Sequence, residues 1–107
     1  MKKITINKLS SEQAAYLAGI IDGEGSIGLI SGRIRLKITQ AEKGKHVLYL
    51  LKDWIGAGSV GLHRKSQGNW QAVYNYRIHS TKGIALIFSQ IKPYLVIKKE
   101  SFERLLN

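Results

Sequence analysis

The sequence predicts an α+β fold whose elements follow in the order αββαββα. Apolar residues recur with helical spacing in separate stretches, and paired segments between them alternate polar with apolar residues. Glycine, serine or proline stands at the junctions of these segments. We expect residues 1–107 to form one domain, because a chain of this length suits a single modest core.

The first helix is expected to run from Gln13 to Ile21. Ser10 or Ser11 is a suitable N-cap, and Gly23 and Gly25 are expected to end the helix. Two strands follow, at about residues 26–31 and 33–40, and a tight turn at Ser31-Gly32 joins them as a hairpin.

A second helix is expected over residues 45–55, stopped by Gly56-Ala-Gly58. Its apolar face holds Val47, Leu48, Leu51, Trp54 and Ile55. A second hairpin is expected from strands 59–65 and 71–79 with a loop at 66–69. A third helix over 82–91 presents Ile84, Leu86, Ile87 and Ile91, and a helical tail over 98–106 follows Pro93.

The composition indicates a polyanionic partner. Lys and Arg number 17 against 7 for Asp and Glu, a net charge of +10. The absence of cysteine excludes disulfides and thiolate zinc sites. The N-terminal segment is too polar for a signal peptide and no apolar run approaches a membrane span, so we expect a soluble protein.

The most informative segment is residues 16–27, with the sequence Tyr-Leu-Ala-Gly-Ile-Ile-Asp-Gly-Glu-Gly-Ser-Ile. An apolar helix here ends at two carboxylates, Asp22 and Glu24. The C-terminus of a helix carries a partial negative charge, so carboxylates beside it are repelled unless a cation is held there. This arrangement predicts a metal site.

Residues Leu17 to Gly25 resemble, without a gap, the signature of the LAGLIDADG homing endonucleases, with Ile20, Gly23 and Glu24 as conservative replacements. The resemblance implies that family's fold, in which a curved four-stranded antiparallel sheet forms a saddle for double-stranded DNA. It also implies a site-specific, metal-dependent endonuclease that cuts a long, nearly palindromic site and serves intron homing. An organellar, prokaryotic or phage setting would fit such a protein.

Glu24 matches the acidic position that binds metal in the family, and the Gly23 carbonyl is a further ligand implied by the resemblance. Oxygen ligands favour Mg²⁺ or another hard divalent cation. For Asp22, a local turn contact to backbone N–H groups is the preferred interpretation over direct metal ligation.

The resemblance implies two further catalytic residues. Gln40 matches a position that orders water near the metal, although an ordinary exposed strand end is the alternative. Lys98 matches a basic residue near the scissile phosphate. A position that is often basic in the family falls on Gly44, so Lys43 or Lys45 would have to replace that group.

A homodimer is expected because the chain carries one copy of the motif and a symmetric site needs two. Small residues spaced along the motif helix would allow a second backbone to approach closely. Packing of this stripe against the chain's own sheet is the alternative. The predicted interface consists of Ala15, Ala18, Gly19 and Ile20.

Charge and hydrophobicity alternate over residues 33–38, which puts three cations on one face of a strand. A solvated surface is the alternative to a DNA-binding one. Arg and Lys suit guanine and Asn suits adenine in the major groove. The predicted DNA contacts are Ser26, Ile30, Arg33, Arg35, Lys37, His63, Lys65, Asn75 and Arg77, while Trp70 suits either the edge of the core or a contact to the DNA backbone.

Two other functions stay open. One is a nucleic-acid binder without cleavage activity on the same scaffold, either a maturase that acts on intron RNA or a DNA-binding regulator. The other is one half of an engineered or split enzyme whose natural partner differs.

Overall fold

The computed structural model describes residues 4–68 and 70–106. Along this part of the chain the elements are α1 (Ser11–Glu24), β1 (Gly25–Ile30), β2 (Arg33–Ala41), α2 (Lys45–Ile55), β3 (Ser59–Arg64), β4 (Val73–Ile78), α3 (Thr81–Ile91) and α4 (Lys99–Leu106). Single 3-10 turns lie at Glu42–Gly44 (η1) and Lys92–Tyr94 (η2). The predicted order αββαββα with a helical tail is confirmed.

Helix α1 begins where the sequence indicates and ends later. Ser10 is the N-cap, and its side chain and that of Gln13 form a reciprocal capping box. The helix continues through Gly23 and closes at Gly25, whose N–H donates to the Ile21 carbonyl. The expectation that Gly23 ends the helix is therefore wrong. A Cβ at Gly25 would lie 2.9 Å from the Ile21 backbone, so this closure requires glycine.

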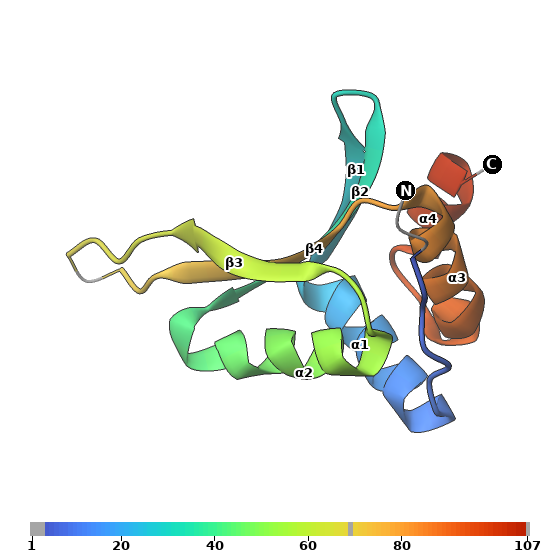
Figure 1. The fold of residues 1–107 in the computed structure, drawn as a ribbon, viewed down its shortest axis with the longest axis horizontal. Coiled ribbons are helices and arrows are strands. Elements are labelled where there is room, and N and C mark those ends of the chain that lie inside the picture. Colours follow the sequence, from blue (N-terminus) through green and yellow to red (C-terminus); the bar gives the residue numbers. More distant parts are fainter. Residues whose placement is uncertain (1–3, 69, 107) are drawn as a thin grey trace.

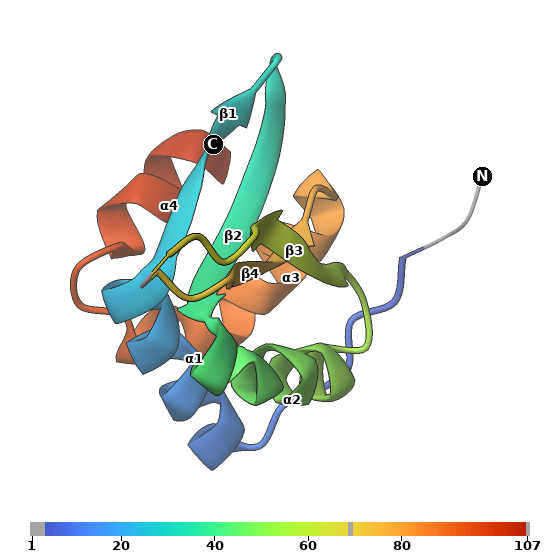
Figure 2. The same ribbon diagram turned by 90° about the vertical axis from the view of Figure 1, so that its left-hand side faces the viewer.

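The four strands form one antiparallel sheet in the order β1-β2-β4-β3. Figure 1 shows the sheet bending so that the β1–β2 and β3–β4 hairpins extend in different directions. Helices α1, α2 and α3 contact the inner strands from one side, as Figure 2 also shows. The core lies between these layers and includes Leu17, Leu36, Leu48, Tyr76 and Ile84. The other face of the sheet is open.

The two hairpins differ in how well the sequence predicts them. Ser31 and Gly32 both have positive φ, 52° and 77°, which fits the tight turn expected there. The β3–β4 ladder is shorter than predicted and contains a register shift between Leu62 and Arg64. The connection from 65 to 72 is longer than the predicted loop, and Asn69 within that loop lies outside the described residues.

Tyr76 ties the sheet to the segment after α2. Its hydroxyl donates a 2.6 Å hydrogen bond to the Ala57 carbonyl, and its ring fills the space beside Gly58, which has φ 94°. Burial raises the pKa of the Tyr76 hydroxyl, so this donor stays protonated. The predicted second helix is confirmed with its bounds, whereas Leu86 of the predicted apolar face of α3 is exposed.

Within the described ranges, none of the helices combines the length and the apolar character that crossing a membrane requires.

Candidate metal centre and nucleic-acid interface

Asp22 sits near the end of α1, where its carboxylate binds three consecutive backbone N–H groups. Val96 donates to Oδ2 at 2.8 Å, and Ile97 and Lys98 donate to Oδ1 at 3.1 and 2.9 Å. Burial acts to raise the pKa of Asp22, but these three hydrogen bonds and the Lys98 charge together hold it below its usual value. The expected contact of Asp22 to backbone N–H groups is therefore present, but the expectation that it forms a local turn is wrong. The donors lie more than 70 residues away along the chain.

The side chain of Lys98 also binds the end of α1. Its ammonium Nζ donates to the carbonyls of Ile21 and Asp22, at 3.1 and 2.9 Å. These carbonyls belong to the last turn of α1, where the helix dipole is negative and backbone acceptors lack helical partners. Lys98 thus supplies a cation that the end of this helix requires. We call this set of five hydrogen bonds the Asp22–Lys98 clasp.

The clasp separates the roles of the two carboxylates. The Asp22 carboxylate is occupied by N–H donors, which leaves Glu24 as the acidic group able to bind an external cation. Glu24 is exposed, and no hydrogen bond or ion pair to it occurs within residues 4–68 and 70–106. In the same ranges no cluster of three or more acidic or histidine side chains forms a metal site within one chain. A metal here would take one carboxylate from this chain.

Asp22 offers a test of the clasp by pH. We expect Asp22→Asn to lower the free energy of unfolding by about 1–2 kcal/mol at neutral pH, since charged acceptors make stronger hydrogen bonds and solvent screens part of the effect. Because the pKa of Asp22 is depressed in the fold, its contribution is complete above the unfolded pKa of about 4 and is lost as the pH falls through the folded value.

Denaturant unfolding of both proteins over a pH series measures this difference. The gap between them should close below about pH 4. Asp53→Asn, which changes an exposed carboxylate on α2, is the matched control. A gap for Asp22→Asn that stays constant from neutral to acid pH would contradict the role assigned to the charge.

Gln40 lies near the same end of the sheet. Gly25 pairs with Ile38, so the chain around Glu24 lies beside the strand end that holds Thr39 and Gln40. A Cβ at Gly44 would lie 2.6 Å from Gln40 Oε1, so the Gln40 side chain occupies the space that a side chain at position 44 would need. A side chain at position 44 would therefore require the flexible end of Gln40 to move.

Both lysines beside Gly44 line a pocket whose lining does not include Glu24, and of the two, Lys45 contacts an aromatic ring. Its ammonium lies 4.9 Å from the centroid of the Tyr74 ring, and Tyr74 is the cross-strand partner of Gln40. The Lys43 backbone N–H instead points to the Gln71 side chain, at 3.5 Å.

The exposed surface of α1 includes a stripe of small residues. Ala15, Gly19 and Gly23 are exposed, and a Cβ at Gly19 or Gly23 would meet nothing within 4 Å. Ala18 is 0% exposed, so its predicted place in a dimer interface is wrong: it shares the core-facing side with Leu17 and Ile21. Ile20 is partly buried at the border.

Apolar residues that the sequence analysis did not single out are exposed around this helix end. Val96 and Ile97, whose backbone N–H groups donate to Asp22, are 83% and 71% exposed. Two turns earlier on α1, Tyr16 packs edge-on against Trp54 and is 45% exposed. The only sequence signal for Val96 and Ile97 is an apolar pair in a short loop, which does not distinguish a core residue from a surface one.

The alternation in β2 is as predicted. Ile34, Leu36 and Ile38 are buried against the helices, and the intervening Arg33, Arg35 and Lys37 face the open side. Strand pairing extends this face, since directly paired residues share a side: Ser26 lies opposite Lys37, Ile30 opposite Arg33, and Arg77 between Lys37 and Ser59.

Asn75 differs from the other predicted DNA contacts on this face because its side chain is buried. It is 3% exposed, and its Nδ2 lies 3.3 Å from His63 Nδ1. The prediction that Asn75 contacts DNA is therefore wrong for this conformation; the side chain positions His63, which is exposed. A Cβ at Gly61 would lie 3.3 Å from Arg77 Nη2, so the absence of a side chain at Gly61 leaves room for the Arg77 guanidinium.

The register shift in β3 determines which cationic residue lies at the end of the open sheet face. Arg64 pairs with Val73, on the same side as Asn75 and Arg77, whereas Lys65 follows the end of β3. Sequence alternation had selected Lys65 and missed Arg64, because a bulge inverts the alternation after it. Trp70 is 67% exposed, which excludes the edge of the core.

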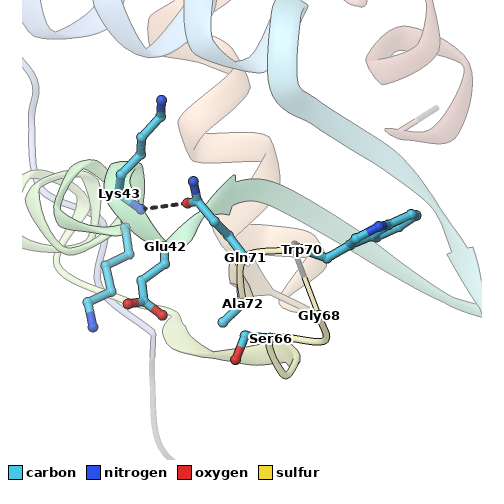
Figure 3. Close-up of a pocket in the computed structure, with 8 residues that line it drawn as sticks. Glu42, Lys43, Ser66, Gly68, Trp70, Gln71 and Ala72 are labelled. Atoms are coloured by element: carbon cyan, nitrogen blue, oxygen red, sulfur yellow. Dashed lines mark hydrogen bonds between the residues drawn. The ribbon is translucent and has the colours of Figure 1, made fainter.

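A pocket of about 590 Å³ lies between the start of α2 and the β3–β4 connection (Figure 3). Its lining includes Glu42, Lys43, Lys45, Ser66 and Gln71, and it does not include Glu24 or the clasp. The pocket is thus separate from the candidate metal centre.

A curved antiparallel sheet with a cationic open face, backed by helices of which one ends beside an exposed carboxylate, has the features of the LAGLIDADG α+β fold. The chain belongs to the LAGLIDADG-like domain family, whose model matches residues 11–107. No curated protein sequence matches the chain.

Solved structures of homing endonucleases share the fold. I-CvuI in complex with its target in the presence of Ca superposes with a TM-score of 0.73 at 19% identity, covering 90% of this chain and 64% of that one. The group I intron-encoded I-CeuI with DNA gives 0.65 at 19% identity, covering 98% and 57%. I-AabMI bound to uncleaved DNA gives 0.65 at 27% identity, covering 84% and 33%. The chain therefore spans less than two thirds of each of these proteins.

Proposed function

We propose that this protein is a site-specific double-strand DNA endonuclease that hydrolyses phosphodiesters with the help of a divalent metal ion. The observation that carries the proposal is the exposed Glu24 carboxylate at the end of the motif helix, left free by a clasp that occupies Asp22. Relatives of the same fold were solved on DNA, and one of them in the presence of Ca. These relatives support the substrate class and a hard cation.

In the proposed site, Glu24 and the Gly23 carbonyl hold Mg²⁺ or a similar cation. When bound, such an ion activates water and neutralises the charge that develops on the phosphate. Gln40 positions a water molecule at the strand end beside Glu24. Lys98 holds the helix end in place and brings its positive charge next to the scissile phosphate, and Lys43 or Lys45 supplies the basic group that Gly44 lacks.

We further propose that the endonuclease is a homodimer. Two copies meeting along Ala15, Gly19 and Ile20 would place two Glu24 carboxylates about a twofold axis, one for each DNA strand. The exposed Val96 and Ile97 beside the same helix end offer apolar surface that a second copy would cover. The bound DNA site would then be long and nearly palindromic.

The open sheet face is the proposed DNA surface. Arg33, Arg35, Lys37 and Arg77 project from it, together with Ser26, Ile30 and His63, and Lys65 follows at its end. A two-stranded antiparallel ribbon fits the major groove, where such side chains reach base edges. The long-range field of a chain with net charge +10 would add to DNA affinity at low salt.

Incubation with a randomised duplex pool in the presence of Mg²⁺, followed by sequencing of the cleaved ends, tests the function directly. We expect cleaved molecules to converge on one extended, nearly symmetric sequence. Sequence-specific binding without cleavage would instead favour a regulator, and preferential binding of intron RNA would favour a maturase.

Arg35→Ala tests the assigned DNA face. Arg35 lies on the open side opposite Gly28, so we expect the variant to bind the selected site about 1–3 kcal/mol more weakly, with relaxed preference at one base pair in each half-site. Competition binding with single-base variants of the site measures both effects. Lys82→Ala, an exposed cation on α3 at the other face, should bind like the unaltered protein. Equal affinity and preference for Arg35→Ala would remove Arg35 from the interface.

A further inference from the structure

The connection between β3 and β4 carries an aromatic residue that the fold does not use. Trp70 is 67% exposed, yet it is held in place: its backbone N–H and carbonyl pair with those of Gln67, at 2.9 and 3.0 Å. Figure 3 shows its indole ring pointing out of the neighbouring pocket, away from Lys43 and Glu42. A large apolar ring fixed in an exposed position indicates a contact surface.

Arg64 is stacked on this ring. Its guanidinium carbon lies 4.9 Å from the centroid of the Trp70 ring, and Nη2 donates to the Gln71 carbonyl at 3.4 Å. The ring contact and this hydrogen bond restrict the guanidinium, whose other N–H groups make no hydrogen bond within residues 4–68 and 70–106. We call this pair the Arg64–Trp70 platform.

The platform continues the open face of the sheet. The register shift places Arg64 opposite Val73, on the side shared with Arg77 and with the proposed DNA surface. Lys65 follows Arg64 directly, and Lys43 and Lys45 line the adjacent pocket, whereas Glu42 is the acidic residue of that lining. The local charge is therefore predominantly positive.

We infer that the Arg64–Trp70 platform binds the sugar–phosphate backbone of the DNA held by the sheet. The platform offers N–H donors and a flat apolar ring, and phosphate oxygens and deoxyribose are their complements. The platform lies at the end of the β3–β4 ladder, beyond the paired residues proposed to contact bases. A protein hairpin that follows a DNA groove would meet the sugar–phosphate backbone at the edge of that groove. The platform fixes the position of the DNA and adds affinity that does not depend on base sequence. This inference rests on the proposed function.

Salt-dependent binding separates backbone contact from base contact. We expect Arg64→Ala to weaken binding equally for the selected duplex and a scrambled duplex, and to reduce the slope of log affinity against log salt by about one. Trp70→Ala should act in the same direction because Arg64 loses its support, while Trp70→Phe keeps a ring there and should retain the slope. Base preferences in the selected pool should not change.

Two exposed residues of α2 provide matched controls: Lys52→Ala removes a cation and Tyr49→Ala removes a ring, and both should bind like the unaltered protein. Thermal unfolding checks that Trp70→Ala folds, as expected for a side chain outside the core. The inference is overturned if Arg64→Ala and Trp70→Ala bind both duplexes as tightly as the unaltered protein, or if their loss is confined to one base position. If the unaltered protein binds no duplex, the proposed function itself fails.

Discussion

Glu24→Gln is expected to abolish DNA cleavage while leaving DNA binding intact. The substitution keeps the size of the side chain and removes the negative charge that would hold a divalent cation. Without that ion neither the attacking water nor the phosphate is activated, so we expect the cleavage rate to fall by more than about 100-fold. Affinity for the selected duplex should stay equal or rise, because the carboxylate no longer repels the phosphates.

Single-turnover cleavage and equilibrium binding on the same selected duplex measure the two effects separately. Glu12→Gln is the matched control, since Glu12 is an exposed carboxylate in the first turn of the same helix. It should cut like the unaltered protein. Equal cutting by Glu24→Gln would take Glu24 out of the reaction, and the proposed function would lose the observation that carries it.

Gly19→Leu is expected to separate the dimer without unfolding the chain. Within one chain the new side chain meets open space, since a Cβ at Gly19 has no atom within 4 Å. Leu also has a higher helix propensity than Gly by about 0.8 kcal/mol, so α1 should not lose stability. Between two chains the side chain would hold the helices apart.

Overpacking by one added side chain costs about 1–3 kcal/mol. A twofold-symmetric dimer contains the substitution twice, so the free energy of association should weaken by about 2–6 kcal/mol. This corresponds to a dimer weakened by roughly 30-fold or more. Sedimentation equilibrium measures the mass over a concentration series, and cleavage of both strands should fall with the dimer fraction. Ala85→Leu, at an exposed small residue of α3, is the control. A dimer of unchanged affinity in Gly19→Leu would place the subunit contact elsewhere.

The sequence predicts the helices and the first hairpin well because local rules determine them. The bounds of α2 follow from its apolar face and from Gly56, and the β1–β2 turn follows from Ser31-Gly32. The second hairpin was predicted less well because a bulge is set by how two strands fit together. Because of that register shift, Arg64 rather than Lys65 pairs on the open face at the end of the ladder.

For the site, the sequence located the helix end and predicted different roles for Asp22 and Glu24, but it placed the Asp22 contact in a local turn. The donors lie instead at Val96 to Lys98, a contact between distant parts of the chain that no local pattern encodes. Ala18 and Asn75 were misassigned for a related reason. Periodicity identifies a face but not which of its residues a neighbouring element covers.

The Asp22–Lys98 clasp has a consequence for the order in which the protein becomes functional. During synthesis the motif helix, residues 11–24, leaves the ribosome before residues 96–98, which secure its end. Until residues 96–98 dock, Asp22 lacks its donors and the last turn of α1 lacks the Lys98 ammonium. A nascent chain in which residues 96–98 have not yet docked therefore lacks all five hydrogen bonds that hold the end of α1 beside Glu24.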